Sequence, residues 1–260
     1  MIKLPSNLNP KRSWFQFRLK TLFVLTAVIT VPCVWLAWKM EAKRKEKEAF
    51  AVIEKLGGYY EHRREGMHHP GPEWLRGLLG DDLFPNVDVV SLFRSKDTDA
   101  VMIYVRDMTN LRSLTLSESL LTDEGLSNVE GLNGLQELDL DGTHITDDGL
   151  KYLEGLTSLE SVQLDGTQVS DIGLKYLEGL TRLKTLWLNN TNINDSGLKH
   201  LEKLTRLEEL RITRTPVTDV GLGHLRGLTG LKVLEIYFTQ TTDAGVSKLQ
   251  EALPNCRIMR

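Results

Sequence analysis

The stretch Leu135–Leu159, which reads LQELDLDGTHITDDGLKYLEGLTSL, decides the fold of this chain of 260 residues. The 24 residues that begin at Leu135 recur with substitutions along most of the sequence. A fixed period in this range is the signature of a solenoid, in which each copy stacks on the one before it. The seven copies lie within 83–250 and begin at Val87, Leu111, Leu135, Leu159, Leu183, Leu207 and Leu231.

Each unit combines a strand pattern with a helix pattern. Leu138 and Leu140 alternate with polar residues, which is the spacing of a strand. Leu150 and Leu153 then lie three residues apart on one face of a short helix, which Gly155 ends. One unit cannot bury its own leucines, but stacked units join them into continuous rows. The sequence therefore predicts an α/β solenoid.

Two polar rows accompany the leucines. A hydroxyl residue such as Thr143 stands in the turn of each unit, where we expect it to bond backbone groups. An aspartate precedes each helical stretch, directly after Thr, Ser or Asn. A carboxylate at this place accepts the free amides of a first helical turn. We therefore predict structural helix caps at Asp99, Asp123, Asp147, Asp171, Asp195, Asp219 and Asp243.

The pattern LxxLxLxxTxITDxGLxxL resembles the leucine-rich repeat, in a short bacterial type similar to the repeats of ribonuclease inhibitor. The resemblance implies a horseshoe with a concave parallel β-sheet and short helices outside. The first unit departs from the pattern, because Asp97 replaces its apolar turn residue and Val101 its glycine. Residues 251–260 keep a strand-like CRIM, and we expect them to form a C-terminal cap.

Residues 21–38, TLFVLTAVITVPCVWLAW, predict a single transmembrane helix ahead of the repeats. Eighteen uncharged residues span about 27 Å as a helix, close to a hydrocarbon core of about 30 Å. A cleaved signal peptide and a buried core helix are the alternatives, but no small-x-small cleavage pattern ends the stretch. Around it we expect a basic segment over 1–20, a juxtamembrane helix over 39–56 and an N-terminal cap over 57–82.

The charges flanking the predicted span do not decide its orientation, since five Lys or Arg precede it and five follow it. Because the first segment usually dominates, we expect a single-pass membrane protein with its repeats on the outer, periplasmic or extracellular side. The order FQFRLKTL, span, EKLGG and WLRGLLG also resembles membrane-anchored leucine-rich repeat proteins of planctomycete-like bacteria. That resemblance brings no assigned activity.

The charge of the chain is unevenly distributed. Residues 1–80 carry 14 Lys and Arg against 7 Asp and Glu, whereas residues 81–260 carry 18 against 28. Acidic repeats argue against a nucleic acid as partner, because phosphates require basic surfaces. The basic N-terminal part suits a membrane surface.

The residues between the strand leucines are expected to face the concave surface. The middle of this surface is acidic, and Trp, Arg and Tyr, the types enriched at binding hot spots, follow it. We predict a groove centred on Trp187 that binds a protein or peptide and prefers basic partners. The alternative is that these are ordinary solvated positions. The predicted binding residues are Glu137, Asp139, Asp141, Asp165, Trp187, Asn189, Arg211 and Tyr237.

The sequence contains none of the motifs GxGxxG, P-loop, HExxH or GxSxG. We therefore predict a protein that is not an enzyme and that uses no cofactor. His68–His69 has no Cys or carboxylate at ligand spacing, so we predict no metal site. The two cysteines, Cys33 and Cys256, lie in the apolar stretch and the end cap, and are not expected to pair. A membrane-tethered spacer that associates with itself is the remaining alternative, and the oligomeric state stays open.

Overall fold

The computed structural model describes residues 10–62 and 87–260. Its centre is one sheet of nine strands that follow one another in chain order. Strands β2 to β9 are parallel, and each residue pairs with the residue 24 positions later, as Leu138 does with Val162. These strands are β2 Val87–Ser91, β3 Ser113–Thr115, β4 Glu137–Asp139, β5 Ser161–Gln163, β6 Thr185–Trp187, β7 Glu209–Arg211, β8 Val233–Glu235 and β9 Arg257–Met259.

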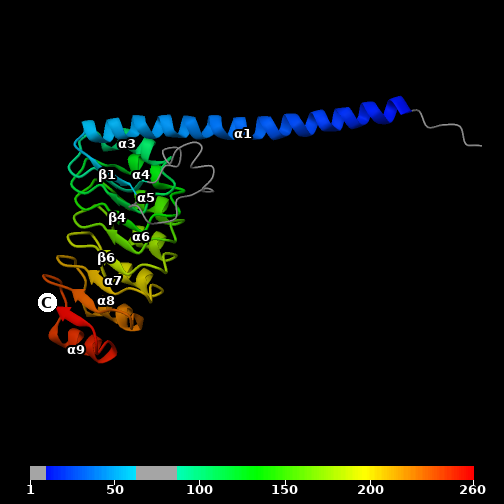
Figure 1. Ribbon diagram of the computed structural model, residues 1–260. Coiled ribbons are helices and arrows are strands. Elements are labelled where there is room, and N and C mark those ends of the chain that lie inside the picture. The colour runs from blue at the N-terminus through cyan, green and yellow to red at the C-terminus, as the bar shows by residue number, and fades with distance from the viewer. Residues whose placement is uncertain (1–9, 63–86) are drawn as a thin grey trace, which may run out of the picture.

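Short helices return the chain to the start of the next strand. Figure 1 shows them stacked on the outside of a gently curved pile. In the five units from α4 to α8 the predicted helical stretch is a short α-helix followed by one 3-10 turn, whereas α3 and α9 are longer helices without one. The helices are α3 Thr98–Val105, α4 Asp123–Leu126, α5 Asp147–Leu150, α6 Asp171–Leu174, α7 Asp195–Leu198, α8 Asp219–His224 and α9 Asp243–Ala252. The 3-10 turns are η2 Ser127–Val129, η3 Lys151–Leu153, η4 Lys175–Leu177, η5 Lys199–Leu201 and η6 Leu225–Gly227.

Rows of apolar side chains between the sheet and the helices form one continuous core. Leu138, Leu140, Ile145 and Leu150 of a single unit are all buried, and their equivalents in neighbouring units continue each row. The hydroxyl of Thr143 donates to the carbonyl of Leu140 at 2.6 Å, and the same bond recurs in the following units. The predicted leucine rows and turn hydroxyls are therefore confirmed.

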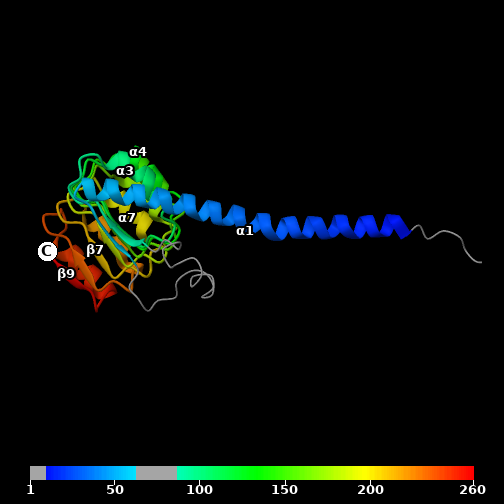
Figure 2. The same ribbon diagram turned by 45° about the horizontal axis from the view of Figure 1, so that its top comes forward.

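The first repeat is covered by the end of a long helix. Helix α1, Pro10–Lys55, runs for 46 residues, so the predicted juxtamembrane helix 39–56 is its C-terminal part. Its buried residues Ala49, Phe50 and Ile53 belong to the core. Strand β1, Tyr59–His62, then pairs antiparallel with β2. Figures 1 and 2 show α1 extending far beyond the pile, across the direction in which the repeats stack.

A search of the described residues finds no helix that is both long and apolar enough to cross a membrane. The predicted span 21–38 falls within α1, but most of its side chains, including those of 21–29, lie outside the described part. The transmembrane helix therefore stays a prediction. The predicted segment 1–20 and the part of the predicted cap from 63 to 82 also fall largely outside the described residues.

The last repeat is completed by β9, which pairs with β8 through Ile258 and Leu234. Leu253 and Cys256 are buried in front of it, so part of the predicted cap 251–260 closes the core. Burial raises the pKa of the Cys256 thiol to about 11, which makes it an unreactive apolar side chain.

Candidate functional site

The exposed side of the sheet, which we call the sheet face, carries all eight predicted binding residues. In β4 the residues Glu137 and Asp139 flank the buried Leu138, because successive side chains of a strand point to opposite sides. Trp187 ends β6 and Arg211 ends β7, and the two are register partners. Asp141, Asp165, Asn189 and Tyr237 each stand two residues beyond the end of a strand.

Four consecutive repeats are joined by side chains at one edge of the sheet face. Asp141 accepts a hydrogen bond from the amide of Asp165, and Asp165 accepts one from the amide of Asn189, both at 2.7 Å. The side-chain oxygen Oδ1 of Asn189 continues the row by accepting from the amide of Thr213 at 2.7 Å. Three of the predicted binding residues therefore also hold the repeats together. This role was missed because each bond spans 24 residues and leaves no mark within one unit.

The two aspartates of this row carry an electrostatic penalty. The pKa of Asp141 is raised to about 7, mainly by burial and also by the nearby charges of Asp165 and Asp139. The amide of Asp165 and the charge of Arg211 lower the same pKa, but by less. The pKa of Asp165 is also raised, again mainly by burial. A cation brought to this place would therefore find carboxylates whose charge is poorly compensated.

A shallow depression of about 250 Å³ lies beside these aspartates. Glu137 and Asp139 line it, and among the described residues their partners are neutral, since Ser113 donates to Glu137 at 3.0 Å and Ser117 to Asp139 at 2.8 Å. Short side chains around the two carboxylates leave the space open. The lining is completed by Ser113, Leu114, Thr115, Leu138, Ser161 and Gln163.

Trp187 and Arg211 form a flat platform next to the acidic area. The Arg211 guanidinium lies 4.0 Å from the centre of the Trp187 ring, a cation–π arrangement. Glu209 holds both, accepting from the indole N–H at 3.0 Å and from Arg211 Nε at 2.7 Å. Glu235 lies 3.5 Å from Arg211 Nε. Glu209 and Glu235 were not among the predicted binding residues, although their positions on the two neighbouring strands were visible in the repeat pattern.

The aspartate row on the helix side works differently from the prediction. The N-cap of α5 is Thr146, whose hydroxyl accepts from the amide of Asp148 at 3.3 Å, and Asp147 is the first helical residue. The Asp147 carboxylate reaches into the next repeat, where it accepts from Ser170 N at 2.7 Å and Ser170 Oγ at 2.6 Å. In α4 to α9 a Thr, Ser or Asn already occupies the N-cap, and except for Asp243 the predicted caps are bonds between repeats. Asp99, Asp123, Asp171, Asp195 and Asp219 make equivalent bonds, and Asp243 pairs with Arg260.

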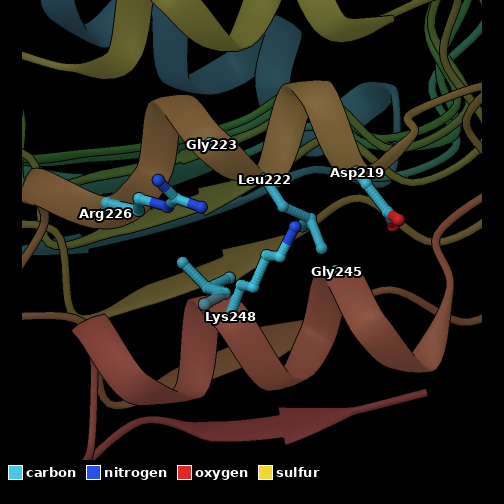
Figure 3. Close-up of a pocket in the computed structure, with 7 residues that line it drawn as sticks. Asp219, Leu222, Gly223, Arg226, Gly245 and Lys248 are labelled. Atoms are coloured by element: carbon cyan, nitrogen blue, oxygen red, sulfur yellow. The ribbon is translucent and has the colours of Figure 1, made fainter.

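A second hollow, of about 100 Å³, lies between α8 and α9 on the helix side. Figure 3 shows Lys248 reaching from α9 toward α8, with Asp219 and Arg226 at either side. Asp219 is already bonded to the amide and hydroxyl of Thr242, so its carboxylate is used by the fold. Thr242 also holds the pKa of Asp219 below its usual range.

Within residues 10–62 and 87–260, no group of three or more His, Cys, Asp or Glu is arranged to hold a metal ion. The dipeptide His68–His69 lies outside this part of the chain. His200 and His224 each bond a glutamate of the preceding repeat, at 2.6 Å to Glu178 and 2.7 Å to Glu202. No arrangement found in the described residues points to catalysis, and the predictions on enzyme activity and cofactors stay predictions.

Comparison with known proteins supports the repeat assignment. Residues 133–153 match the family described as Leucine Rich repeat. An internalin C2 of Listeria monocytogenes is 24% identical with a TM-score of 0.50, over 66% of this chain and 80% of that one. A leucine-rich repeat protein of Leptospira interrogans is 22% identical with a TM-score of 0.51, over 61% of this chain and 39% of that one. No curated protein matches the sequence. These findings support a leucine-rich repeat protein, and the likeness to the solved structures extends to the fold alone.

Proposed function

We propose that this leucine-rich repeat protein is a membrane-tethered interaction module that binds a basic segment of another protein on its sheet face. One observation carries the proposal. Four carboxylates gather on the sheet face, and none of them makes a salt bridge among the residues that the structure describes. These are Glu137, Asp139, Asp141 and Asp165.

The chemistry of recognition follows from the charge that is left uncompensated. A Lys or Arg of the partner entering the depression would meet Glu137 and Asp139, whose present partners are neutral hydroxyls. A charge-assisted hydrogen bond is stronger than a neutral one, and Arg is able to bind a carboxylate with two parallel bonds. The same cation would ease the ionisation of Asp141.

The platform of Trp187 and Arg211 supplies the second contact. Aromatic and arginine side chains contribute most of the energy at protein interfaces when they sit in the middle of a contact area. Glu209 and Glu235 hold Arg211 in place over the indole, so little side-chain entropy is lost when a partner covers it.

The tether is proposed from the sequence of residues 21–38 and from the helical path of α1, which continues from this stretch to Ala49, Phe50 and Ile53 in the core. The repeats are proposed to lie on the outer side. Protease added to intact cells after permeabilisation of the outer layer tests this arrangement. We expect the repeats to be digested; survival until the inner membrane is broken would place them in the cytoplasm.

The binding face is tested by photocrosslinking of the full chain in the cells that produce it. A photoreactive residue at Gln163, in the depression, is compared with one at Glu154, which is exposed on the helix side. We expect adducts with a second protein from position 163 only, and a lower yield when Glu137→Gln and Asp139→Asn are combined. Equal adducts from both positions, or adducts only with a second copy of this chain, would reject the proposal.

A further inference from the structure

One residue in the turn after each of the strands β2 to β8 has a positive φ, and these residues recur every 24 positions. The conformation lets each turn bond the next repeat, as Gly142 N does to Asp165 O at 2.7 Å and Arg214 N to Tyr237 O at 2.8 Å. Glycine adopts it without strain, and Gly142 and Gly166 do so with φ of 64° and 68°. Five residues other than glycine adopt the same backbone conformation, with φ between 53° and 58°: Arg94, Glu118, Asn190, Arg214 and Phe238.

Phe238 is the residue of this row that the fold explains least. A bulky side chain at φ 56° is strained, and a glycine would relieve the strain. Packing does not compensate for the strain, because Phe238 is 78% exposed. Strained residues that persist without a structural benefit are found at ligand contacts.

The surroundings of Phe238 have the composition of a contact surface. Tyr237 beside it is 40% exposed, and the Arg214 guanidinium lies 5.4 Å from the centre of the Phe238 ring. Arg94, its equivalent at the other end of the row, is paired with Glu118 at 3.2 Å. Arg214 makes no salt bridge within the described part of the chain.

We infer that Arg214, Tyr237 and Phe238, which we call the rim patch, take a carboxylate next to an apolar or aromatic side chain of the partner. The choice follows from charge complementarity, because the guanidinium of Arg214 offers a bidentate site for a carboxylate beside an exposed ring. The inference rests on the proposed function, since the rim patch would hold the other end of the segment whose basic end lies in the acidic area.

The repeat geometry sets the spacing between the two ends. Asp141, in the repeat of Glu137 and Asp139, and Tyr237 occupy equivalent positions four repeats apart, so about 19 Å separates them at a strand spacing of about 4.8 Å. An extended polypeptide that crosses the strands covers this distance in about six residues. The partner segment therefore has Lys or Arg at one end and, about six residues away, Asp or Glu beside an apolar residue.

The probe is a phage library of random 12-residue peptides, selected on the full chain in detergent micelles. Enriched peptides are then made with a fluorescent label, and their Kd is measured by anisotropy. We expect enriched peptides to contain both the basic and the acidic–apolar element at this spacing. The variants Phe238→Gly and Arg214→Glu should each weaken binding tenfold or more, and so should replacing the acidic residue of the peptide with Ala.

Two control variants change the same chemistry elsewhere. Ile172→Ser removes an exposed apolar side chain on the helix side, and Arg226→Glu reverses a charge there. Both should leave Kd within twofold. The enriched peptides could instead be basic, lack the acidic–apolar element and bind Phe238→Gly and Arg214→Glu with the same Kd as the wild type. That result would overturn the inference while the proposed function stands. If no peptide is enriched, or if binding is insensitive to Glu137→Gln with Asp139→Asn as well, the proposed function fails and the inference with it.

Discussion

Asp147 and Gly173 depend on each other across two repeats. Gly173 N donates to Asp147 Oδ1 at 3.0 Å, and a Cβ added to Gly173 would lie only 2.5 Å from the same oxygen. The carboxylate thus fills the space that a side chain would need. The same relation recurs in the other repeats, for example between Asp123 and Gly149, and it explains the recurring TDxG motif.

The first prediction is that Gly173→Ala destabilises the protein, by about 1–3 kcal/mol, because the added methyl group overpacks a filled site. Asp147→Ala should cost about 1.5–3 kcal/mol, because its hydrogen bonds to Ser170 and Gly173 are lost. Urea unfolding of the single and double variants measures both. The double variant should be more stable than the sum of the single effects implies, since without the carboxylate the methyl group has room.

The matched control is Gly155→Ala, because a Cβ at Gly155 would meet nothing within 4 Å. This variant should be neutral or slightly more stable. Additive effects of the Asp147 and Gly173 substitutions would show that the pairing is not the reason for the glycine.

The parts of the fold that depend on residues of a single unit could be predicted from the sequence. The position of β4 and the burial of Leu138 and Leu140 follow from alternation, and the sheet-face position of Trp187 follows from the same pattern. The contacts that were not predicted are those between units. The role of Asp147 was assigned to its own helix, whereas the residues that it bonds are 23 and 26 positions later.

The departures of the first unit gave a signal that was not used. The first repeat has no repeat before it that could supply an aspartate, and there Val101 replaces the glycine. The structure buries Val101 in the core near α1. That coincidence would have linked the glycine to the aspartate. For Phe238 the signal lay in other units, because Gly142 and Gly166 stand at the equivalent positions, whereas Phe itself does not mark a turn.

The second prediction is that Phe238→Gly stabilises the fold while it removes a binding residue. The gain is about 1 kcal/mol, because the strain of the left-handed conformation is lost. Thermal unfolding of the full chain measures it. The reverse change, Gly142→Ala at the equivalent position with φ 64°, should destabilise by a similar amount. A Phe238→Gly variant that is less stable than the wild type would show that the ring contributes to folding instead.

The third prediction concerns the platform on the sheet face. A double-mutant cycle of Trp187→Leu and Arg211→Met should give a coupling energy of about 0.5–1 kcal/mol, the range for a partly exposed cation–π pair. Arg211 also balances Glu209 and Glu235, so its removal should cost more than removal of Trp187. Arg214→Met, combined with Trp187→Leu, serves as the control and should be additive. A coupling near zero would mean that the stacking contributes nothing to stability.

The last prediction is that Asp141→Asn makes the protein more stable at pH 8 than the wild type. Because the folded-state pKa of Asp141 is raised to about 7, the native state binds more protons than the unfolded chain between the ordinary aspartate pKa and about 7. The stability of the wild type therefore falls as pH rises through this window, and the whole penalty is present above it. Asn removes the charge but keeps the oxygen that accepts from Asp165 N, and Asn189 already fills the same role two repeats later.

Urea unfolding from pH 4 to pH 8 should show a shallower decline in the free energy of unfolding for Asp141→Asn than for the wild type. Asp148→Asn, an equal change of charge on the exposed helix side, should keep the wild-type slope. An unchanged slope in Asp141→Asn would mean that Asp141 ionises freely in the folded state and that its burial carries no cost to the fold.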